Sequence, residues 1–133
     1  MKKAILILIL MNFSCTNQNR LVENENKIKI FLTNKKDGNF NLVLDTISSF
    51  QWDELLVAGP YTNLDKISGY NLSKIPNTIK SHDSFILFCF INKKKGIKFM
   101  EFKRYLLSDK LFEKKMLNEI YSKAESNFSI TKK

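Results

Sequence analysis

The stretch SFILFCFI-NKKKG-IKFMEFKR, Ser84–Arg104, decides the fold. Its first part, Ser84–Ile91, is almost wholly apolar, which predicts a central strand covered on both faces. The polar segment Asn92–Gly96 predicts a hairpin turn in which Gly96 takes a positive φ. Residues Ile97–Arg104 mix apolar and charged side chains, which predicts the partner strand. The sequence therefore indicates an antiparallel hairpin at the centre of the domain.

The C-terminal side of this hairpin predicts a helix followed by a strand. Ser108 can cap a helix over Asp109–Tyr121, in which apolar residues share one face and lysines lie mostly on the other. Ser122–Glu125 has the pattern of a second capped turn. Phe128–Thr131 (FSIT) predicts a last edge strand.

The N-terminal side predicts three further strands. Lys27–Leu32 (KIKIFL) begins with polar and apolar residues in alternation, which predicts a strand. The turn signal Asp37-Gly38 then predicts a hairpin with Phe40–Leu44 (FNLVL) as partner. Phe50–Ala58 (FQWDELLVA) predicts a third strand, although its pattern also fits a helix.

A short helix is predicted between these strands and the central hairpin. Thr62 can cap it, Asn63–Ser68 forms it and Gly69 ends it. The elements together predict an α+β fold, an antiparallel sheet of four to six strands with one or two packed helices. The length of 133 residues fits one domain. We expect that domain to span residues 28–133.

The first fifteen residues predict a targeting signal. The basic start Met1–Lys3 precedes the apolar run Ala4–Met11, which is far shorter than the roughly 20 residues that span a bilayer. Residues 1–14 therefore indicate a signal peptide. The pair Ser14-Cys15 is similar to the lipobox of bacterial lipoproteins, which implies cleavage before Cys15 and acylation of its thiol. An ordinary secretory signal with an incidental cysteine is the alternative.

The segment after Cys15 is polar. Residues 16–27 (TNQNRLVENENK) include four Asn and few apolar side chains. We expect residues 15–27 to be the lipidated cysteine and a flexible tether.

The charge is strongly positive but unlike that of a nucleic-acid-binding protein. The formal net charge is +9, and only Arg20 and Arg104 are arginines among 22 basic residues. Base and phosphate recognition favours arginine, so we expect no nucleic-acid partner. Several basic residues gather on the predicted central hairpin, namely Lys93, Lys94, Lys95, Lys98, Lys103 and Arg104. They predict either contact with anionic lipid or a solvated hairpin tip.

The most distinctive stretch for binding is Phe50–Thr62. It contains Trp52, the only tryptophan, beside Asp53, and then the turn residue Tyr61. As a binding site, Trp52 and Tyr61 would be aromatic anchors and Asp53 a polar contact. As a structural feature, Trp52 would fill the core, Asp53 would accept backbone hydrogen bonds and Tyr61 would close the sheet edge. Both interpretations remain open.

No residues form a recognisable catalytic set. Asp53 and Glu54 are neighbours in a predicted strand and point to opposite faces. The sole histidine, His82, lies in a polar loop without the Gly-x-Ser-x-Gly motif of a hydrolase. Cys89 lies within an apolar strand, where cysteine is usually a buried hydrophobe. We expect no catalytic residue, no metal and no cofactor.

Several of these motifs together resemble a group of small uncharacterised Gram-negative lipoproteins. The shared features are the lipobox, Phe50-x-Trp52-Asp53-x-Leu55, Gly59-Pro60-Tyr61-Thr62, Gly69-Tyr70 and His82-Asp83-Ser84 before an apolar hairpin. The resemblance covers roughly residues 40–104 and implies no established activity. It implies that the segment from Trp52 to Tyr61 is a hallmark of the group.

The sequence thus predicts a non-enzymatic binding module, lipid-anchored through Cys15 in the cell envelope of a Gram-negative bacterium. We expect the outer membrane as its location and a protein of the envelope as its partner. The alternative is an immunity or inhibitor lipoprotein that neutralises a toxin or a lytic enzyme in the periplasm.

Overall fold

The computed structural model describes residues 18–34, 38–104 and 117–132. These residues form one α-helix and six strands, which gives the predicted α+β fold. The elements are α2 (Val22–Asn34), β1 (Gly38–Val43), β2 (Glu54–Ala58), β3 (Phe85–Asn92), β4 (Lys95–Lys103), β5 (Glu119–Ser122) and β6 (Asn127–Lys132). Three short 3-10 helices complete them, namely η1 (Leu64–Lys66), η2 (Asn77–Ser81) and η5 (Lys123–Glu125).

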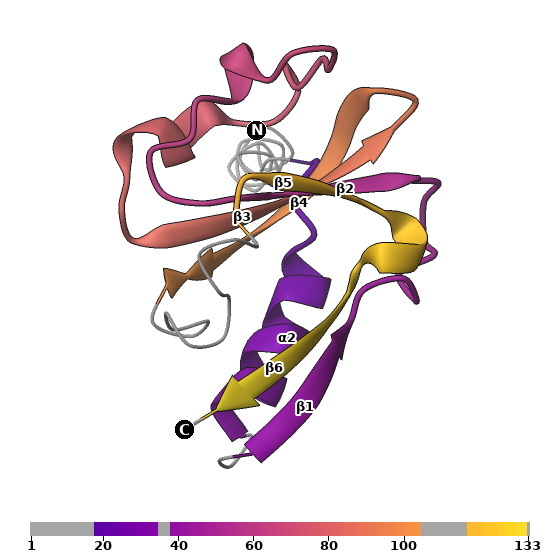
Figure 1. The fold of residues 1–133 in the computed structure, drawn as a ribbon, viewed down its shortest axis with the longest axis vertical. Coiled ribbons are helices and arrows are strands. Elements are labelled where there is room, and N and C mark those ends of the chain that lie inside the picture. Colours follow the sequence, from indigo (N-terminus) through magenta and orange to yellow (C-terminus); the bar gives the residue numbers. More distant parts are fainter. Residues whose placement is uncertain (1–17, 35–37, 105–116, 133) are drawn as a thin grey trace, which may run out of the picture.

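The strands form two antiparallel sheets (Figure 1). The larger has the order β4-β3-β2-β5, and the smaller is the pair β1-β6. In Figure 1, α2 runs from the larger sheet down beside the β1-β6 ribbon, and the connection between β2 and β3 lies on the other side of the sheet.

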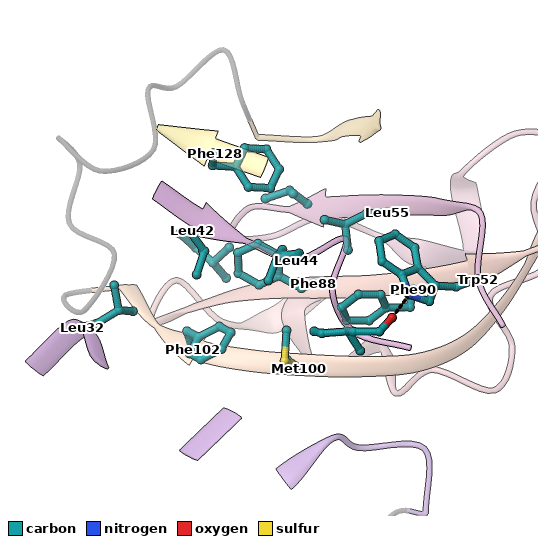
Figure 2. Close-up of a cluster of buried hydrophobic side chains, with 13 residues drawn as sticks. Leu32, Leu42, Leu44, Trp52, Leu55, Phe88, Phe90, Met100, Phe102 and Phe128 are labelled. Carbon is teal, nitrogen blue, oxygen red and sulfur yellow. Dashed lines mark hydrogen bonds between the residues drawn. The ribbon is translucent and has the colours of Figure 1, made fainter. Parts of the chain in front are cut away.

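Strand β3 is central and covered on both faces, as predicted. Its side chains alternate between two cores: Phe88 and Phe90 face one, while Leu87 and Cys89 face the other. The first core is closed by residues of α2, β1 and β6 (Figure 2). The second is closed by the connection between β2 and β3, which contributes Leu64, Leu72, Ile75 and Ile79. The apolar run therefore exists because each face of β3 has its own covering layer.

The β3–β4 hairpin is confirmed, but its turn differs from the prediction. Lys93 and Lys94 occupy the two loop positions with φ of 50° and 66°, whereas Gly96 does not have a positive φ. Two successive positive φ values are typical of the type I′ turn that suits the twist of paired strands. Gly96 is required for a different reason. A Cβ there would lie 2.9 Å from Ile75 Cγ1 and 3.0 Å from Leu72 Cδ2.

The strand predicted over Lys27–Leu32 is wrong, because these residues belong to α2. Ile28 and Leu32 are four residues apart and both pack on the first core, while Ile30 between them is 61% exposed. That spacing is helical. Residues 18–27, predicted to be a flexible tether, instead pair with β4 and form the first half of α2.

Strands β1 and β6 pair with each other rather than with their chain neighbours. The strand predicted over Phe40–Leu44 corresponds to β1, and that over Phe128–Thr131 corresponds to β6. Their register places Leu42 opposite Phe128. Both side chains are buried in the first core, so the β1–β6 ribbon helps to cover that core.

Two local predictions are corrected and a third is confirmed. The short helix after Thr62 is the 3-10 turn η1, and its cap is Asn63, whose side chain accepts a hydrogen bond from the Asp65 N–H at 3.1 Å. The helix predicted over Asp109–Tyr121 falls largely on residues 105–116, outside the described ranges, but its last residues belong to β5. The capped turn at Ser122 is confirmed, since Glu125 accepts a hydrogen bond from the Ser122 N–H at 3.2 Å.

Candidate functional site

Trp52 lies in the first core rather than on the surface. Its exposed fraction is 4%, and its indole Nε1 donates a hydrogen bond to the Ile47 carbonyl at 2.7 Å (Figure 2). The ring meets Phe90 edge-on, with centroids 4.9 Å apart, and the Lys123 Nζ lies 4.9 Å from the indole centroid. The structural interpretation therefore holds for Trp52: it packs the core and satisfies its polar atom internally.

Asp53 is exposed and joins β2 to the β3–β4 turn. Its N–H donates to the Ile91 carbonyl at 2.9 Å, and its carbonyl accepts from the Lys123 N–H at 2.9 Å. The carboxylate Oδ2 accepts a hydrogen bond from the Lys93 N–H at 3.3 Å. We refer to the part of the sheet around this turn, residues 53–54 and 92–95, as the turn end.

Tyr61 lies beyond the other end of β2 and is 63% exposed. Its φ is 63°, an uncommon value for a residue with a side chain. Its N–H donates to the carbonyls of Ile79, at 3.0 Å, and His82, at 3.3 Å. We call this region, residues 59–62 with Asn118, the far end. The structure therefore does not bring Tyr61 together with Trp52 and Asp53, because β2 separates them.

Asn118 holds the turn that carries Tyr61. Its Oδ1 accepts hydrogen bonds from the Gly59 N–H at 3.0 Å and the Thr62 hydroxyl at 2.6 Å. Its own N–H donates to the Val57 carbonyl at 2.6 Å. An exposed aromatic ring on a strained backbone that several hydrogen bonds fix is a feature typical of recognition sites. Sequence reasoning singled out Tyr61 but missed Asn118, which lies 59 residues after Gly59 in the chain.

A polar cluster at the turn end was not predicted. The Tyr70 hydroxyl donates to Glu54 Oε2 at 2.7 Å, and the Lys94 Nζ donates to Glu54 Oε1 at 3.2 Å and to the Tyr70 oxygen at 2.9 Å. The hydrogen bonds to Tyr70 and Glu54 raise the pKa of Lys94. Lys94 also lies 4.5 Å from the Tyr70 ring centroid. Since each side chain has partners within the cluster, we interpret it as a tie between β2, the turn and the segment after η1.

The residues considered for catalysis do not converge. His82 and Asp83 are exposed in the loop before β3, and Ser84 donates its hydroxyl to the neighbouring Asp83 carboxylate at 3.2 Å. Cys89 is fully buried, and burial raises the pKa of its thiol to about 12. Within residues 18–34, 38–104 and 117–132, no three His, Cys, Asp or Glu side chains are grouped to hold a metal ion.

The first described residues are fastened to the edge of the sheet. Arg20 forms a bridge with Phe99 of β4, whose N–H donates to the Asn19 carbonyl at 2.9 Å. The Lys98 Nζ donates to the Gln18 carbonyl at 3.2 Å. We call residues 18–21 the entry segment. Cys15, the predicted lipidation site, lies outside the described residues.

The entry segment is also secured to α2. The Arg20 guanidinium makes two hydrogen bonds to the Glu25 carboxylate, at 2.7 Å and 2.9 Å. Glu25 is only 1% exposed, and Lys29 lies 3.5 Å from its Oε1. A carboxylate buried to this extent requires its cation, so the pair locks the entry segment to the helix.

No protein-family model, curated protein or solved structure matches this chain. Among the described residues, no helix is long and apolar enough to cross a membrane.

Proposed function

We propose that this chain is a lipid-anchored protein of the Gram-negative cell envelope that acts by binding another protein, without catalysis. The anchor is the acylated Cys15, supported by the short apolar run and the Ser14-Cys15 pair. The observation that carries the binding role is Tyr61: an exposed ring on a positive-φ residue that Asn118 and backbone hydrogen bonds hold in place. Tyrosine supplies apolar contact area at low entropic cost, so it is favoured in protein recognition.

The contact set differs from the one predicted from sequence. Trp52 is enclosed by the core and Asp53 lies at the turn end, so neither adjoins Tyr61. We therefore place the partner surface at the far end, centred on Tyr61 with Thr62 beside it.

Crosslinking and affinity capture of the full-length tagged protein from its native membranes tests the binding role. We expect one protein partner at near-stoichiometric yield, and at least a tenfold lower yield for Tyr61→Ala. Phe31→Ala is the matched control, since it removes another exposed aromatic ring, on α2. A partner that is a toxin or lytic enzyme would make this an immunity protein. No partner, or equal loss in both variants, contradicts the proposal.

The anchor is tested separately. Cys15→Ala should abolish incorporation of radiolabelled palmitate and release the protein from the membrane fraction. Cys89→Ala is the control, because it removes the only other cysteine and leaves the proposed acylation site intact. Labelling that survives Cys15→Ala shows that the anchor is elsewhere.

A further inference from the structure

The distance between the lipid and the folded domain is limited by the chain itself. Only three peptide units join Cys15 to Gln18, and three extended residues reach at most about 11 Å. Gln18 is already fastened to Lys98, and the next residues are fastened to Phe99. If Cys15 is acylated, as the proposed function requires, the edge of the sheet at the entry segment lies within about 11 Å of the lipid attachment.

A small basic hollow lies beside the entry segment. It has a volume of about 60 Å³ and lies between the start of β4 and the loop before η2, with Asn71, Ser73, Lys74, Lys95, Gly96 and Ile97 as its lining. Two backbone hydrogen bonds fix its walls: Asn71 N–H to the Lys94 carbonyl at 2.8 Å, and Gly96 N–H to the Asn71 carbonyl at 2.9 Å. The Asn19 side chain donates to the Lys74 carbonyl at 3.3 Å, which places the hollow next to the entry segment.

The lining of this hollow is suited to an oxyanion. Lys74 and Lys95 supply positive charge, and Asn71 and Ser73 supply polar side chains, while none of the six lining residues is acidic. Two carboxylates near this end have cations of their own, since Glu54 pairs with Lys94 and Glu25 with Arg20, while the Asp53 carboxylate accepts a hydrogen bond from the Lys93 N–H. A volume of about 60 Å³ holds roughly four waters, which suffices for a phosphate group.

We propose that the Lys74–Lys95 hollow binds the phosphate of an anionic phospholipid head group, and that this contact orients the domain with its turn end on the bilayer and its far end outward. The proposal rests on the proposed anchor, because the short link is what brings the hollow to the head groups. Lys93, in the turn just before Lys95, and Lys98, in β4 just after Ile97, add to the attraction toward an anionic surface. In this orientation the lysines of the β3–β4 turn contact lipid head groups.

Lysine footprinting of the full-length acylated protein tests this contact. The protein is reconstituted into vesicles of phosphatidylglycerol and phosphatidylcholine, or of phosphatidylcholine alone, and its acetylation rates are read by mass spectrometry. We expect Lys74 and Lys95 to react at least about fivefold more slowly in the anionic vesicles, the factor that one lysine at an anionic surface contributes. Lys80 and Lys103 are exposed lysines toward the far end and should change less than about twofold.

Paired variants identify the residues responsible. Lys74→Gln/Lys95→Gln should abolish the difference between the two vesicle types at the remaining turn-end lysines. Lys80→Gln/Lys103→Gln removes the same charge and should leave that difference unchanged. Circular dichroism of each variant verifies that the fold persists. Equal effects of the two pairs would show a general charge effect and overturn the hollow.

Two further measurements show which part of the proposal fails if the lysines are not protected as expected. Inorganic phosphate added to the protein in neutral detergent should protect the two lysines less than the anionic vesicles do; protection equal to that in anionic vesicles would make the hollow a soluble-anion site and overturn the membrane contact. Intact mass shows whether Cys15 carries lipid. Absence of the lipid refutes the anchor, whereas unprotected lysines on an acylated chain refute the orientation alone.

Discussion

At Gly96 the absence of a side chain, rather than backbone freedom, is what the fold uses. A Cβ at this position would lie within 2.9–3.2 Å of Ile75, Leu72 and Cys89. We predict that Gly96→Ala lowers the free energy of unfolding by about 1–3 kcal/mol through overpacking, measured by urea denaturation. The comparison is Gly69→Ala, where nothing lies within 4 Å but φ is +82°, so its cost of about 1 kcal/mol is backbone strain. An unchanged midpoint for Gly96→Ala would show that Leu72 and Ile75 do not pack against β4.

The Tyr70 hydroxyl is the largest contributor to the raised pKa of Lys94. We predict that Tyr70→Phe lowers the pKa of Lys94 toward its ordinary value, followed by NMR of the lysine Cε resonances against pH. Tyr61→Phe, which removes a hydroxyl at the far end, should leave Lys94 unchanged. Because the pKa is raised on folding, the network stabilises the fold at pH values below the ordinary lysine pKa and ceases to do so as pH rises through the raised value. A Lys94 titration unaltered by Tyr70→Phe would contradict this.

At the scale of elements, α2 depends on an ion pair with one partner outside the helix. Arg20 precedes the helix, and Glu25 is buried within its first two turns. Removing one partner of a buried pair costs about 3–5 kcal/mol. Since the Arg20 side chain is 38% exposed and Lys29 remains near Glu25, we predict a smaller loss of about 2 kcal/mol for Arg20→Met, measured by thermal and urea unfolding.

The double variant distinguishes charge from packing. Arg20→Met/Glu25→Met leaves no unpaired carboxylate in the core, so it should be more stable than Arg20→Met alone. Additive losses in the double variant would show that the two side chains act independently.

Helix α2 also shows why part of the fold could not be predicted from the sequence. The alternation in KIKIFL places Ile28, Ile30 and Leu32 on one face of a strand, yet Ile30 is 61% exposed and only the i, i+4 pair is packed. The central hairpin was predictable because its signals are local: an apolar run, a polar turn and a mixed return strand. The pairing of β1 with β6 was not, because it joins residues about ninety positions apart.

The candidate site likewise has features that the sequence predicted and features that it did not. Tyr61 was noticed because Gly59-Pro60-Tyr61 is a distinctive turn, but its support by Asn118 depends on β5, where the sequence predicts helix. The basic residues of the hairpin were also noticed. Their closeness to the proposed anchor could not be predicted, because the entry segment was predicted to be flexible and is instead paired with β4.

At the scale of the whole molecule, the two ends of the sheet have different environments. The hollow and the hairpin residues Lys93, Lys94 and Lys95 lie at the turn end, with the entry segment beside the hollow, whereas the far end has the exposed Tyr61 on its fixed turn. The short covalent link to lipid that we propose at the first end would direct the second away from the bilayer. Anchoring and partner binding can then act together without competing for the same surface.

This arrangement predicts how the protein responds to a longer tether. Trp52 is the only tryptophan and lies near the turn end, so energy transfer from it to a dansyl-labelled lipid reports how close that end is to the bilayer. Inserting twenty Gly and Ser residues between Cys15 and Gln18 raises the root-mean-square length of the link to about 25–30 Å. In phosphatidylcholine vesicles we therefore expect transfer to fall. In vesicles that contain phosphatidylglycerol it should be largely retained, because the lysines of the hollow hold the turn end at the surface.

Adding Lys74→Gln/Lys95→Gln to the insertion should remove that retention, whereas Lys80→Gln/Lys103→Gln should preserve it. Transfer that falls equally in both kinds of vesicle would show that the link alone, and not the basic hollow, sets the position of the domain.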